Sequence, residues 1–351
     1  MSNNQQQPGC PFGTHRVLEP EGALPQPAWR LDNRPVAHDN EILIDVRMLN
    51  VDAASFTQME EAADSDAAGV GRLIMDTVAK RGKQHNPVTG SGGVLIGEVL
   101  EVGTKHPDYG KTKPGDKIVT LVSLSLTPLQ LDEVTGVDLA TDQVEVRGRA
   151  ILFATGIYSI LPDDMPEKLA LAVLDVAGAP AQTARLVRPG DTVFVIGAGG
   201  KSGLLCMYEA KRRAGVTGRV IGLGHSPASC QRAVESGFAD LVLQGDAGQP
   251  LEVLRLVEEA TGGKLCDVTI NCVNVPGTEM ASILATRDGG DLYFFSMATS
   301  FTAAALGAEG IGRDVNMIVG NGYCKGHAAM ALNCLRESPM LRRIFEKQFV
   351  S

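Results

Sequence analysis

The run DTVFVIGAGGKSG at residues 191–203 constrains this chain more than any other stretch of its sequence. An apolar β-branched segment at 193–196 ends abruptly in a cluster of glycines, and an apolar helix-forming segment at 204–210 follows at once. The cluster consists of Gly197, Gly199, Gly200 and Gly203. This order predicts a strand, a tight turn and a helix, in which glycines let backbone N–H groups approach a pyrophosphate at the positive end of the helix. The sequence therefore predicts a site for NAD or NADP.

The glycine spacing by itself leaves an alternative open. Gly197-x-x-Gly200-x-x-Gly203 departs from the strict G-x-G-x-x-G, so the run can also be a strand-to-helix turn that binds no ligand. The adjoining Gly200-Lys201-Ser202 looks like the end of a P-loop. That loop needs a glycine five residues before the Gly-Lys pair, and position 195 is Val. The spacing thus excludes a P-loop and favours the dinucleotide turn.

The composition excludes several classes of protein. A net charge of −9 over 351 residues opposes binding to the phosphate backbone of nucleic acids. No apolar run approaches the ~18 residues of a membrane span, and the start MSNNQQQPGC lacks the charged and apolar regions of a signal peptide. The seven cysteines are odd in number and form no C-x-x-C pair, which is typical of free thiols in a reducing compartment. We therefore expect a cytoplasmic protein with no nucleic-acid or membrane partner.

The hydrophobic periodicity divides the chain into a β-rich front part and an alternation of strands and helices. After a loosely packed polar tail at 1–15, the front part has strands expected at 41–48, 94–102 and 118–122, a helix at 66–81 and a glycine-rich loop at 82–93. Further along, six strands are expected at 192–196, 219–223, 241–243, 267–271, 290–295 and 315–319. Helices are expected at 201–213, 228–236, 249–260, 276–285 and 328–346.

This pattern predicts an α/β protein with a doubly wound parallel six-stranded Rossmann sheet and a β-rich, partly barrel-like N-terminal catalytic domain. One amphipathic helix, broken near Gly178 and Pro180, is expected at 167–187 between the two. The expected parts are the β-rich domain at 1–165, the connecting helix at 166–189, the Rossmann domain at 190–325 and a C-terminal helix at 326–351.

The order of these parts, with PGDTVFVIGAGG at 189–200, KPGDKIVTL at 113–121 and GSGGVLIGEVLEVG at 90–103, resembles the medium-chain dehydrogenase/reductase superfamily. The resemblance implies a GroES-like front domain, and a homodimer or homotetramer formed by pairing the edge of the dinucleotide sheet. Zinc-using members carry an early Cys and a His-Glu pair, where this chain reads NVDAAS at 50–55 and SGG at 91–93. The closely spaced cysteines of a structural zinc lobe are missing as well, so we expect no zinc.

Six further stretches are more specific than a glycine turn. They are GTHRVLEPEGALPQPA (13–28), LNVDAASFTQ (49–58), NPVTGSGG (86–93), LVSLSLTPL (121–129), LDVAGAPAQ (174–182) and FFSMATSFTAAALGAEGIG (294–312). They resemble the L-erythro-3,5-diaminohexanoate dehydrogenase family of anaerobic lysine fermentation, over nearly the whole chain. The resemblance implies oxidative deamination: the 3-amino group leaves as ammonia, 5-amino-3-oxohexanoate forms, and NAD(P)+ takes the hydride.

Candidate cofactor residues surround the glycine turn. Lys201 and Ser202 stand at the predicted helix N-terminus, where a cation and a hydroxyl add to phosphate binding. No Asp or Glu follows the second strand, where an NAD site holds the ribose hydroxyl. His225, Ser226 and Arg232 are candidates to bind a 2′-phosphate instead, so we predict that NADP is used at least as well as NAD. The ends of the fourth and fifth strands contribute Asn271, Asn274, Ser296 and Met297.

Candidate substrate residues follow from the implied reaction, which needs a neutral amine, a cationic or N–H-rich anchor for the carboxylate and an acidic anchor for the second ammonium. The candidates for acid–base work and the acidic anchor are Asp175, Asp52, Glu60 and Glu61, with Ser55 beside Asp52. Asp175 falls within the apolar run LALAVLDVAGA, where a buried carboxylate needs a partner for either a structural or a functional role. The candidate substrate anchors, each of which can equally be a structural or solvated residue, are Arg81, Lys83, His85 and His327.

Two other functions remain open at this point. Zinc-independent quinone and enoyl reductases share the Gly-x-x-Gly-x-x-Gly turn and would oxidise NADPH without ammonia. A redox-sensing module would bind NADPH without turnover. The proton-transfer residue is not identified by the sequence, since several acids are compatible with the order of parts.

Overall fold

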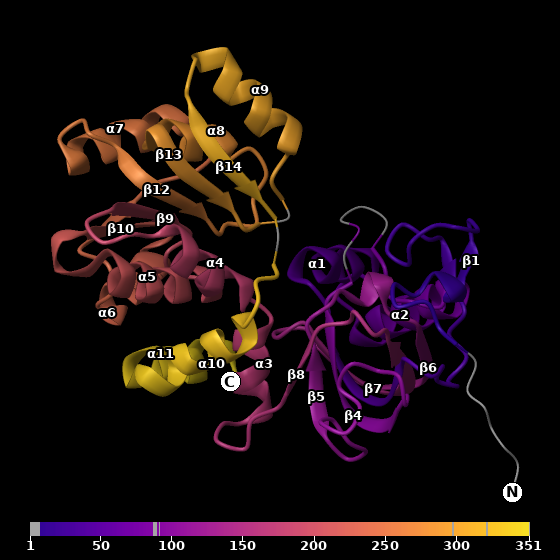
Figure 1. Cartoon of the computed structure of the whole chain (residues 1–351). Helices are drawn as coiled ribbons and strands as arrows, with labels where there is room; N and C mark the ends of the chain where they lie inside the picture. The colour runs from indigo at the N-terminus through magenta and orange to yellow at the C-terminus, as the bar shows by residue number, and fades with distance from the viewer. Residues whose placement is uncertain (1–7, 87–89, 91, 297, 321, 351) are drawn as a thin grey trace, which may run out of the picture. The chain divides into compact units, whose positions relative to one another are not determined.

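The computed structural model describes residues 8–86, 90, 92–296, 298–320 and 322–350, with only the backbone for Ala53 and Ala54. The chain divides into two compact units, Met1–Glu167 and Lys168–Ser351 (Figure 1). Over the described residues, no helix combines the length and the apolar character needed to cross a membrane.

The first unit is built on a six-stranded antiparallel sheet. Its strand order is β6-β7-β3-β4-β5-β8. The strands are β3 (Ile42–Asn50), β4 (Val94–Val102), β5 (Lys117–Thr120), β6 (Leu129–Asp138), β7 (Gln143–Leu152) and β8 (Tyr158–Ile160). Two helices, α1 (Ala53–Ala62) and α2 (Ala67–Arg81), and a two-stranded sheet of β1 (Val17–Glu19) and β2 (Arg30–Leu31) complete the unit. The β-rich front part is therefore confirmed, while α1 and the β6–β7 pair were not predicted.

One apolar core joins this sheet to its helices. Alternate residues of β3 point inward, so Ile42 and Ile44 are buried beside Ile74 and Val78 of α2 and Phe56 of α1. The helix α2 begins after Asp66, whose carboxylate accepts hydrogen bonds from two backbone N–H groups, and ends at Gly82 in the left-handed conformation. These local stop and start signals explain why the helix expected at 66–81 is observed.

The segment before β1 is packed rather than loose. A Cβ at Gly13 would lie 2.4 Å from the ring of Phe153, and the Cys10 backbone N–H donates to Nδ1 of His15 over 3.0 Å. The Arg16 guanidinium is buried and donates to the backbone carbonyls of Asp32, Arg34 and Val36. The expectation of a loose tail is thus wrong for residues 8–15, while residues 1–7 lie outside the described part of the chain.

The second unit is a doubly wound α/β domain. Its parallel sheet has the order β11-β10-β9-β12-β13-β14, which confirms the six-stranded Rossmann prediction. The strands are β9 (Thr192–Ile196), β10 (Arg219–Gly224), β11 (Leu241–Gln244), β12 (Cys266–Asn271), β13 (Thr286–Phe294) and β14 (Val315–Val319). The helices are α3 (Glu167–Leu174), α4 (Gly178–Leu186), α5 (Lys201–Ala214), α6 (Pro227–Ser236), α7 (Pro250–Thr261), α8 (Glu279–Ala285), α9 (Phe301–Ile311), α10 (His327–Glu337) and α11 (Pro339–Phe349).

One helix has the break that was expected near Gly178, and another is split where no break was expected. The helix expected at 167–187 is α3 and α4, separated by a turn at 175–177. Pro180 lies in the first turn of α4, where a missing N–H costs nothing. The helix expected at 328–346 is α10 and α11, because Pro339 begins a new helix capped by the Ser338 hydroxyl. Both α10 and α11 pack beside α5 (Figure 1).

Candidate functional site

The glycine turn brings strand, helix and neighbouring helix into close contact. A Cβ at Gly203 would lie 2.1 Å from the carbonyl oxygen of Gly197, and one at Gly199 would lie 2.2 Å from that of Ser229. Gly197 itself has a φ of +85°, which side chains disfavour. At Gly200, the N-cap of α5, the nearest atom to a Cβ is 3.5 Å away. The glycines thus allow close backbone packing and leave the start of α5 open.

A pocket of about 360 Å³ lies at this turn. Its walls come from the glycine turn, from the ends of β10 and β11, from α6 and from the segment that follows β12. The lining includes Gly197, Gly200, His225, Ser229, Arg232, Cys272 and Asn274. In a parallel α/β sheet, ligands bind at the carboxyl ends of the strands, so the pocket has the position of a dinucleotide site.

The pocket carries positive and neutral polar groups. Arg232 donates from Nε to the carbonyl oxygen of Gly199 over 2.9 Å, so its guanidinium is held against the turn. His225 is exposed directly after β10, and among the described lining residues none carries a carboxylate. This surface suits an anion. It lacks the acid that would bind an unmodified ribose through its hydroxyls.

Other predicted cofactor residues have structural partners. Ser226 caps α6 by accepting a hydrogen bond from the Ser229 N–H. Asn271 is buried and donates to the hydroxyls of Thr278 and Ser282, so it holds the segment after β12. Lys201 places its ammonium 5.9 Å from the Phe349 ring of α11. These three side chains therefore have structural contacts near the glycine turn, and none of them is among the described residues that line the pocket.

Ser202, Ser296 and Met297 are the remaining predicted cofactor residues. Ser202 is buried in the first turn of α5. The Ser296 hydroxyl donates to Asn274 Oδ1 over 3.4 Å and accepts from the Ala298 N–H. Met297 lies outside the described residues. Ser296 therefore contacts the pocket residue Asn274.

In the first unit, Asp52 and Ser55 form a bonded pair at the start of α1. The Asp52 carboxylate accepts from the Ser55 N–H over 3.1 Å and from its hydroxyl over 2.5 Å. Ser55 is buried and Asp52 is half-buried. One turn further along, the amide of Asn86 donates to Gln58 Oε1 over 3.0 Å and ties α1 to the segment at 82–86. Gln58 and Asn86 were not among the predicted site residues.

Three of the stretches that carry the family resemblance meet here. The Gly92 N–H donates to the Ser123 hydroxyl over 3.1 Å, and the Leu124 N–H donates to the Gly93 carbonyl over 2.8 Å. A Cβ at Gly93 would lie 2.0 Å from the Asn50 carbonyl oxygen. The described residues of these three stretches, among them Asn50, Gly93 and Ser123, are therefore neighbours in space. We call this group, together with Asp52, Ser55, Gln58 and Asn86, the first-unit polar site.

Two predicted anchors for the substrate carboxylate, Arg81 and Lys83, already donate hydrogen bonds to backbone carbonyls. Arg81 donates to the Trp29 carbonyl over 3.1 Å, and its guanidinium lies 4.3 Å from the centre of the Trp29 ring. Lys83 is completely buried and donates to the carbonyls of Pro25 and Gln26 over 2.7 and 2.9 Å. Burial, with Arg81 nearby, lowers the pKa of Lys83 to about 7. These two side chains hold the segment at 25–29 against the start of the loop.

Gln84 and His85, which follow Lys83 in the chain, each bury a polar atom. Gln84 is 2% exposed, and neither its Oε1 nor Nδ1 of His85 has a hydrogen-bond partner among the described residues. Burial, with Arg81 and Lys83 nearby, lowers the pKa of His85 to about 4, so the ring is neutral at pH 7. The loop thus brings a neutral imidazole and an amide close to the first-unit polar site.

The remaining candidates lie elsewhere. Glu61 is exposed on α1 and Glu60 is half-buried there. Asp175 is half-buried in the turn after α3, so its expected place inside an apolar helix is wrong, because α3 ends at Leu174. His327 begins α10, packs edge-on against Tyr323 with ring centres 5.3 Å apart, and has its pKa lowered by burial.

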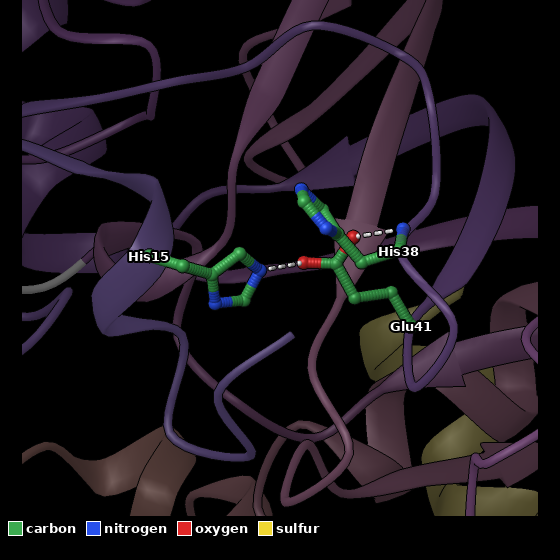
Figure 2. A group of neighbouring side chains, drawn as sticks. All are labelled: His15, His38 and Glu41. Atoms are coloured by element: carbon green, nitrogen blue, oxygen red, sulfur yellow. Dashed lines mark hydrogen bonds and ion pairs between the residues drawn. The ribbon is translucent and has the colours of Figure 1, made fainter. Parts of the chain in front are cut away.

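One group in the described residues has the composition of a metal site: His15, His38 and Glu41, whose ligand atoms lie within 4.8 Å of one another (Figure 2). Glu41 Oε1 accepts from His15 Nε2 and from Arg16 Nε over 2.9 and 2.7 Å. Its Oε2 accepts from Arg16 Nη2 and from the His38 N–H over 2.6 and 2.8 Å. Because the buried Arg16 cation already neutralises the carboxylate, this group fits a structural ion pair and not a metal centre.

Comparisons with known proteins agree with the resemblance seen in the sequence. Residues 15–162 match the family model described as the L-erythro-3,5-diaminohexanoate dehydrogenase N-terminal domain. The chain is 57% identical over 342 residues to an L-erythro-3,5-diaminohexanoate dehydrogenase of Acetoanaerobium sticklandii, covering 97% of this chain and 99% of that protein. It is 54% identical over 344 residues to the enzyme of the same name from Fusobacterium nucleatum, with the same coverage of both chains.

Solved structures resemble the fold at much lower identity. An Escherichia coli quinone oxidoreductase complexed with NADPH has a TM-score of 0.52 and 17% identity, covering 87% of this chain and 81% of that one. An alcohol dehydrogenase from Thermus sp. ATN1 has a TM-score of 0.52 and 18% identity, covering 88% and 86%. These likenesses confirm the fold class.

Proposed function

Since the chain belongs to the L-erythro-3,5-diaminohexanoate dehydrogenase family, we propose that it oxidises L-erythro-3,5-diaminohexanoate to 5-amino-3-oxohexanoate and ammonia with NAD(P)+, in anaerobic lysine degradation. The observation that carries the proposal is 57% identity over 97% of the chain. The quinone or enoyl reductase and the NADPH-sensing module are not favoured, because the likeness to a quinone oxidoreductase is 17% identity in a shared fold.

The reaction sets requirements for the protein. The bound nicotinamide supplies the acceptor for the hydride that leaves C3 of the substrate. Hydride leaves only when the 3-amine is neutral, so the protein must remove an ammonium proton, and water then replaces the nitrogen at C3. The carboxylate and the second ammonium of the substrate each need a partner of opposite charge or matching dipole.

We place the cofactor in the pocket at the glycine turn. The open N-terminus of α5 at Gly200 suits the pyrophosphate. Arg232 and His225, together with the lack of a carboxylate among the described lining residues, favour a 2′-phosphate. We therefore propose that NADP is used at least as well as NAD.

We place the substrate at the first-unit polar site. Asp52, bonded to Ser55, is the proposed acid–base group or acidic anchor, and the Gln58–Asn86 amide pair adds hydrogen-bonding groups beside it. Arg81 and Lys83 remain substrate-site residues only through the segment that they hold, since their polar groups already bind carbonyls. The roles of Glu61, Asp175, His85 and His327 stay predictions.

We also propose that the reaction needs no zinc. Asp52 and Ser55 lie where zinc-using relatives place their first ligand. Neither supplies the thiolate or imidazole that a tetrahedral site prefers. The His15–His38–Glu41 group does not substitute, because its carboxylate is bonded to Arg16.

A second copy of the chain is the proposed protein partner. The edge strand β14 exposes Val319, and the neighbouring helix α9 exposes Phe301, Leu306 and Ile311. Pairing of two β14 edges would cover this apolar surface and form a homodimer or, with a further interface, a homotetramer. The seven free cysteines support a reducing cytoplasm as its location. A monomer at micromolar concentration in light scattering would contradict the dimer.

The first experiment follows absorbance at 340 nm with purified protein, L-erythro-3,5-diaminohexanoate and either NAD+ or NADP+, in the presence of a chelator. We expect absorbance to rise with an equal release of ammonia. A strong preference for NAD+ would contradict the assignment of Arg232 and His225. Tight NADPH binding with no turnover of either cofactor would favour the sensing module instead.

A further inference from the structure

Two thiols meet beside the pocket at the glycine turn. Sγ of Cys206, in the second turn of α5, lies 3.8 Å from Sγ of Cys272, which follows β12. Both cysteines are free. Cys206 is completely buried, whereas Cys272 is partly exposed and belongs to the pocket lining. Cys272 therefore lies on the pocket side of the pair, and Cys206 lies behind it.

The backbone of Cys272 is part of the turn's support. Its N–H donates to the carbonyl of Ile196, the last residue of β9, over 3.0 Å. A Cβ at Gly197 would lie 3.4 Å from the carbonyl carbon of Cys272 and 2.8 Å from the side chain of Val273. Movement of Cys272 toward α5 would therefore displace atoms that contact the first glycine of the turn.

We propose that Cys206 and Cys272 are an oxidation site at which a peroxide forms a disulfide, and that this bond weakens dinucleotide binding. The proposal rests on the assignment of the pocket to the cofactor. The Cys272 thiolate attacks one peroxide oxygen, the O–O bond breaks, and a sulfenic acid and one water form. The Cys206 sulfur then attacks the sulfenic sulfur, the S–S bond forms, and a second water leaves. Two thiols lose two electrons in total, and the peroxide gains them.

Closing the bond changes the geometry of the pocket wall. A disulfide has an S–S distance of about 2.05 Å, so the sulfurs must approach by roughly 1.8 Å from 3.8 Å. Rotation of the two side chains, together with shifts of the segment after β12 and of α5, brings the sulfurs together, and both segments border the proposed site. Displacements of about 1 Å in a preorganised site have effects of up to about 100-fold. We expect the Kd for NADPH to rise by about tenfold or more.

The chemistry of the pair also predicts when it reacts. The hydrogen bond with Cys206, together with the desolvation of Cys272, raises the pKa of the Cys272 thiol. Oxidation is therefore slow at neutral pH and faster at alkaline pH, where more thiolate is present. A bound dinucleotide covers the Cys272 side of the pocket, so saturating NADPH should slow the reaction.

The experiment treats the full chain with hydrogen peroxide, with and without saturating NADPH. It measures the intact mass, the cysteine-linked peptides and the fluorescence titration of NADPH. We expect a loss of 2 Da, a linked peptide pair containing residues 206 and 272, protection by NADPH, and recovery of binding after dithiothreitol. The Cys206→Ala variant should show neither the linked pair nor reversible weakening. Cys266→Ala, an equally buried cysteine at the start of β12, is the matched control and should behave as the unchanged protein.

The outcomes test the oxidation site separately from the assignment of the pocket to the cofactor. Linked residues 206 and 272 with an unchanged Kd for NADPH overturn the effect on binding, and a different linked pair or no linked pair overturns the oxidation site. Equal reversible weakening in Cys206→Ala also overturns the proposal. If the reduced protein does not bind NADPH, the cofactor assignment fails while the mass measurement still decides the bond. Because the mass measurements use the unchanged protein, they remain decisive even if Cys206→Ala folds poorly.

Discussion

Replacing Glu41 by Gln tests the buried ion pair that holds the N-terminal segment. Gln keeps the shape of the side chain but removes the charge that Arg16 neutralises. Both partners are at most 1% exposed, and the carboxylate accepts four hydrogen bonds. Breaking such a pair and leaving a buried charge costs about 3–5 kcal/mol. We therefore expect the Glu41→Gln variant to lose about that much free energy of unfolding in the first unit at pH 7.

The lowered pKa of Glu41 gives a second figure for the free energy that the ion pair contributes to folding. Burial alone would raise its pKa, but the bonds from Arg16 and His15 dominate and lower it from 4.5 to about 2. At about 1.4 kcal/mol for each pH unit, this difference corresponds to about 3 kcal/mol. Because the folded-state pKa is the lower one, this stability is fully present above pH 4.5 and is lost as the pH falls toward 2.

The assay is urea unfolding followed by the fluorescence of Trp29, the one tryptophan of the chain, whose ring lies against Arg81. Glu98→Gln, which removes the half-buried partner of the exposed Arg47, is the matched control and should cost less than about 1 kcal/mol. A loss below 1 kcal/mol for Glu41→Gln at pH 7, or an unchanged acid slope between pH 5 and 3, would refute the reasoning.

Four further predictions concern the two candidate sites and the loop beside them. Gly203→Ala places a Cβ 2.1 Å from a carbonyl oxygen and should abolish NADPH binding in a fluorescence titration, whereas Gly310→Ala, with open space around it, should not. Arg232→Ala should raise the Kd for NADPH about tenfold or more and change that for NADH little, since a bond to a charged group contributes about 1.5–3 kcal/mol. Asp52→Asn keeps a good helix cap, so kcat/KM should fall by about 100-fold or more with unchanged NADPH affinity, and full activity would contradict the assignment. Burial lowers the pKa of Lys83 to about 7, so the unfolded chain binds more protons than the folded one above that value; stability should rise from about pH 7 toward 10, and Lys83→Met should lack this rise in urea unfolding.

Elements with a strong local pattern could be predicted to the residue. The strand β4 coincides with the apolar run expected at 94–102, which follows a glycine pair and ends at Gly103. The helix α1 was missed because AASFTQMEEA has only two large apolar residues, Phe56 and Met59, and its start depends on the cap at Asp52. The helix α9 was missed because its many alanines and glycines define no distinct apolar face. Length and periodicity could not separate these segments from loops.

The candidate sites also combine features that local sequence predicts with features that it does not. The glycine turn was predictable, since spacing along the chain is what builds it. Lys83 reads as a solvated loop residue, yet its ammonium binds carbonyls 57 and 58 positions earlier. The Gln58–Asn86 bond and the Cys206–Cys272 contact join residues 28 and 66 positions apart. No local pattern records which distant segment will cover a side chain, so these contacts come from the fold alone.

The bond between Lys83 and Pro25 also sets an order of events during synthesis. The segment at 25–29 leaves the ribosome first, but the ammonium that holds it is added 58 residues later. At 5–20 residues per second, the segment waits about 3 to 12 s for that partner. Asn33 waits longer still, because its amide donates to the carbonyl of Leu129, 96 residues further on. The N-terminal part of this protein is therefore made first and fixed in place only after the chain has passed the middle of the first unit.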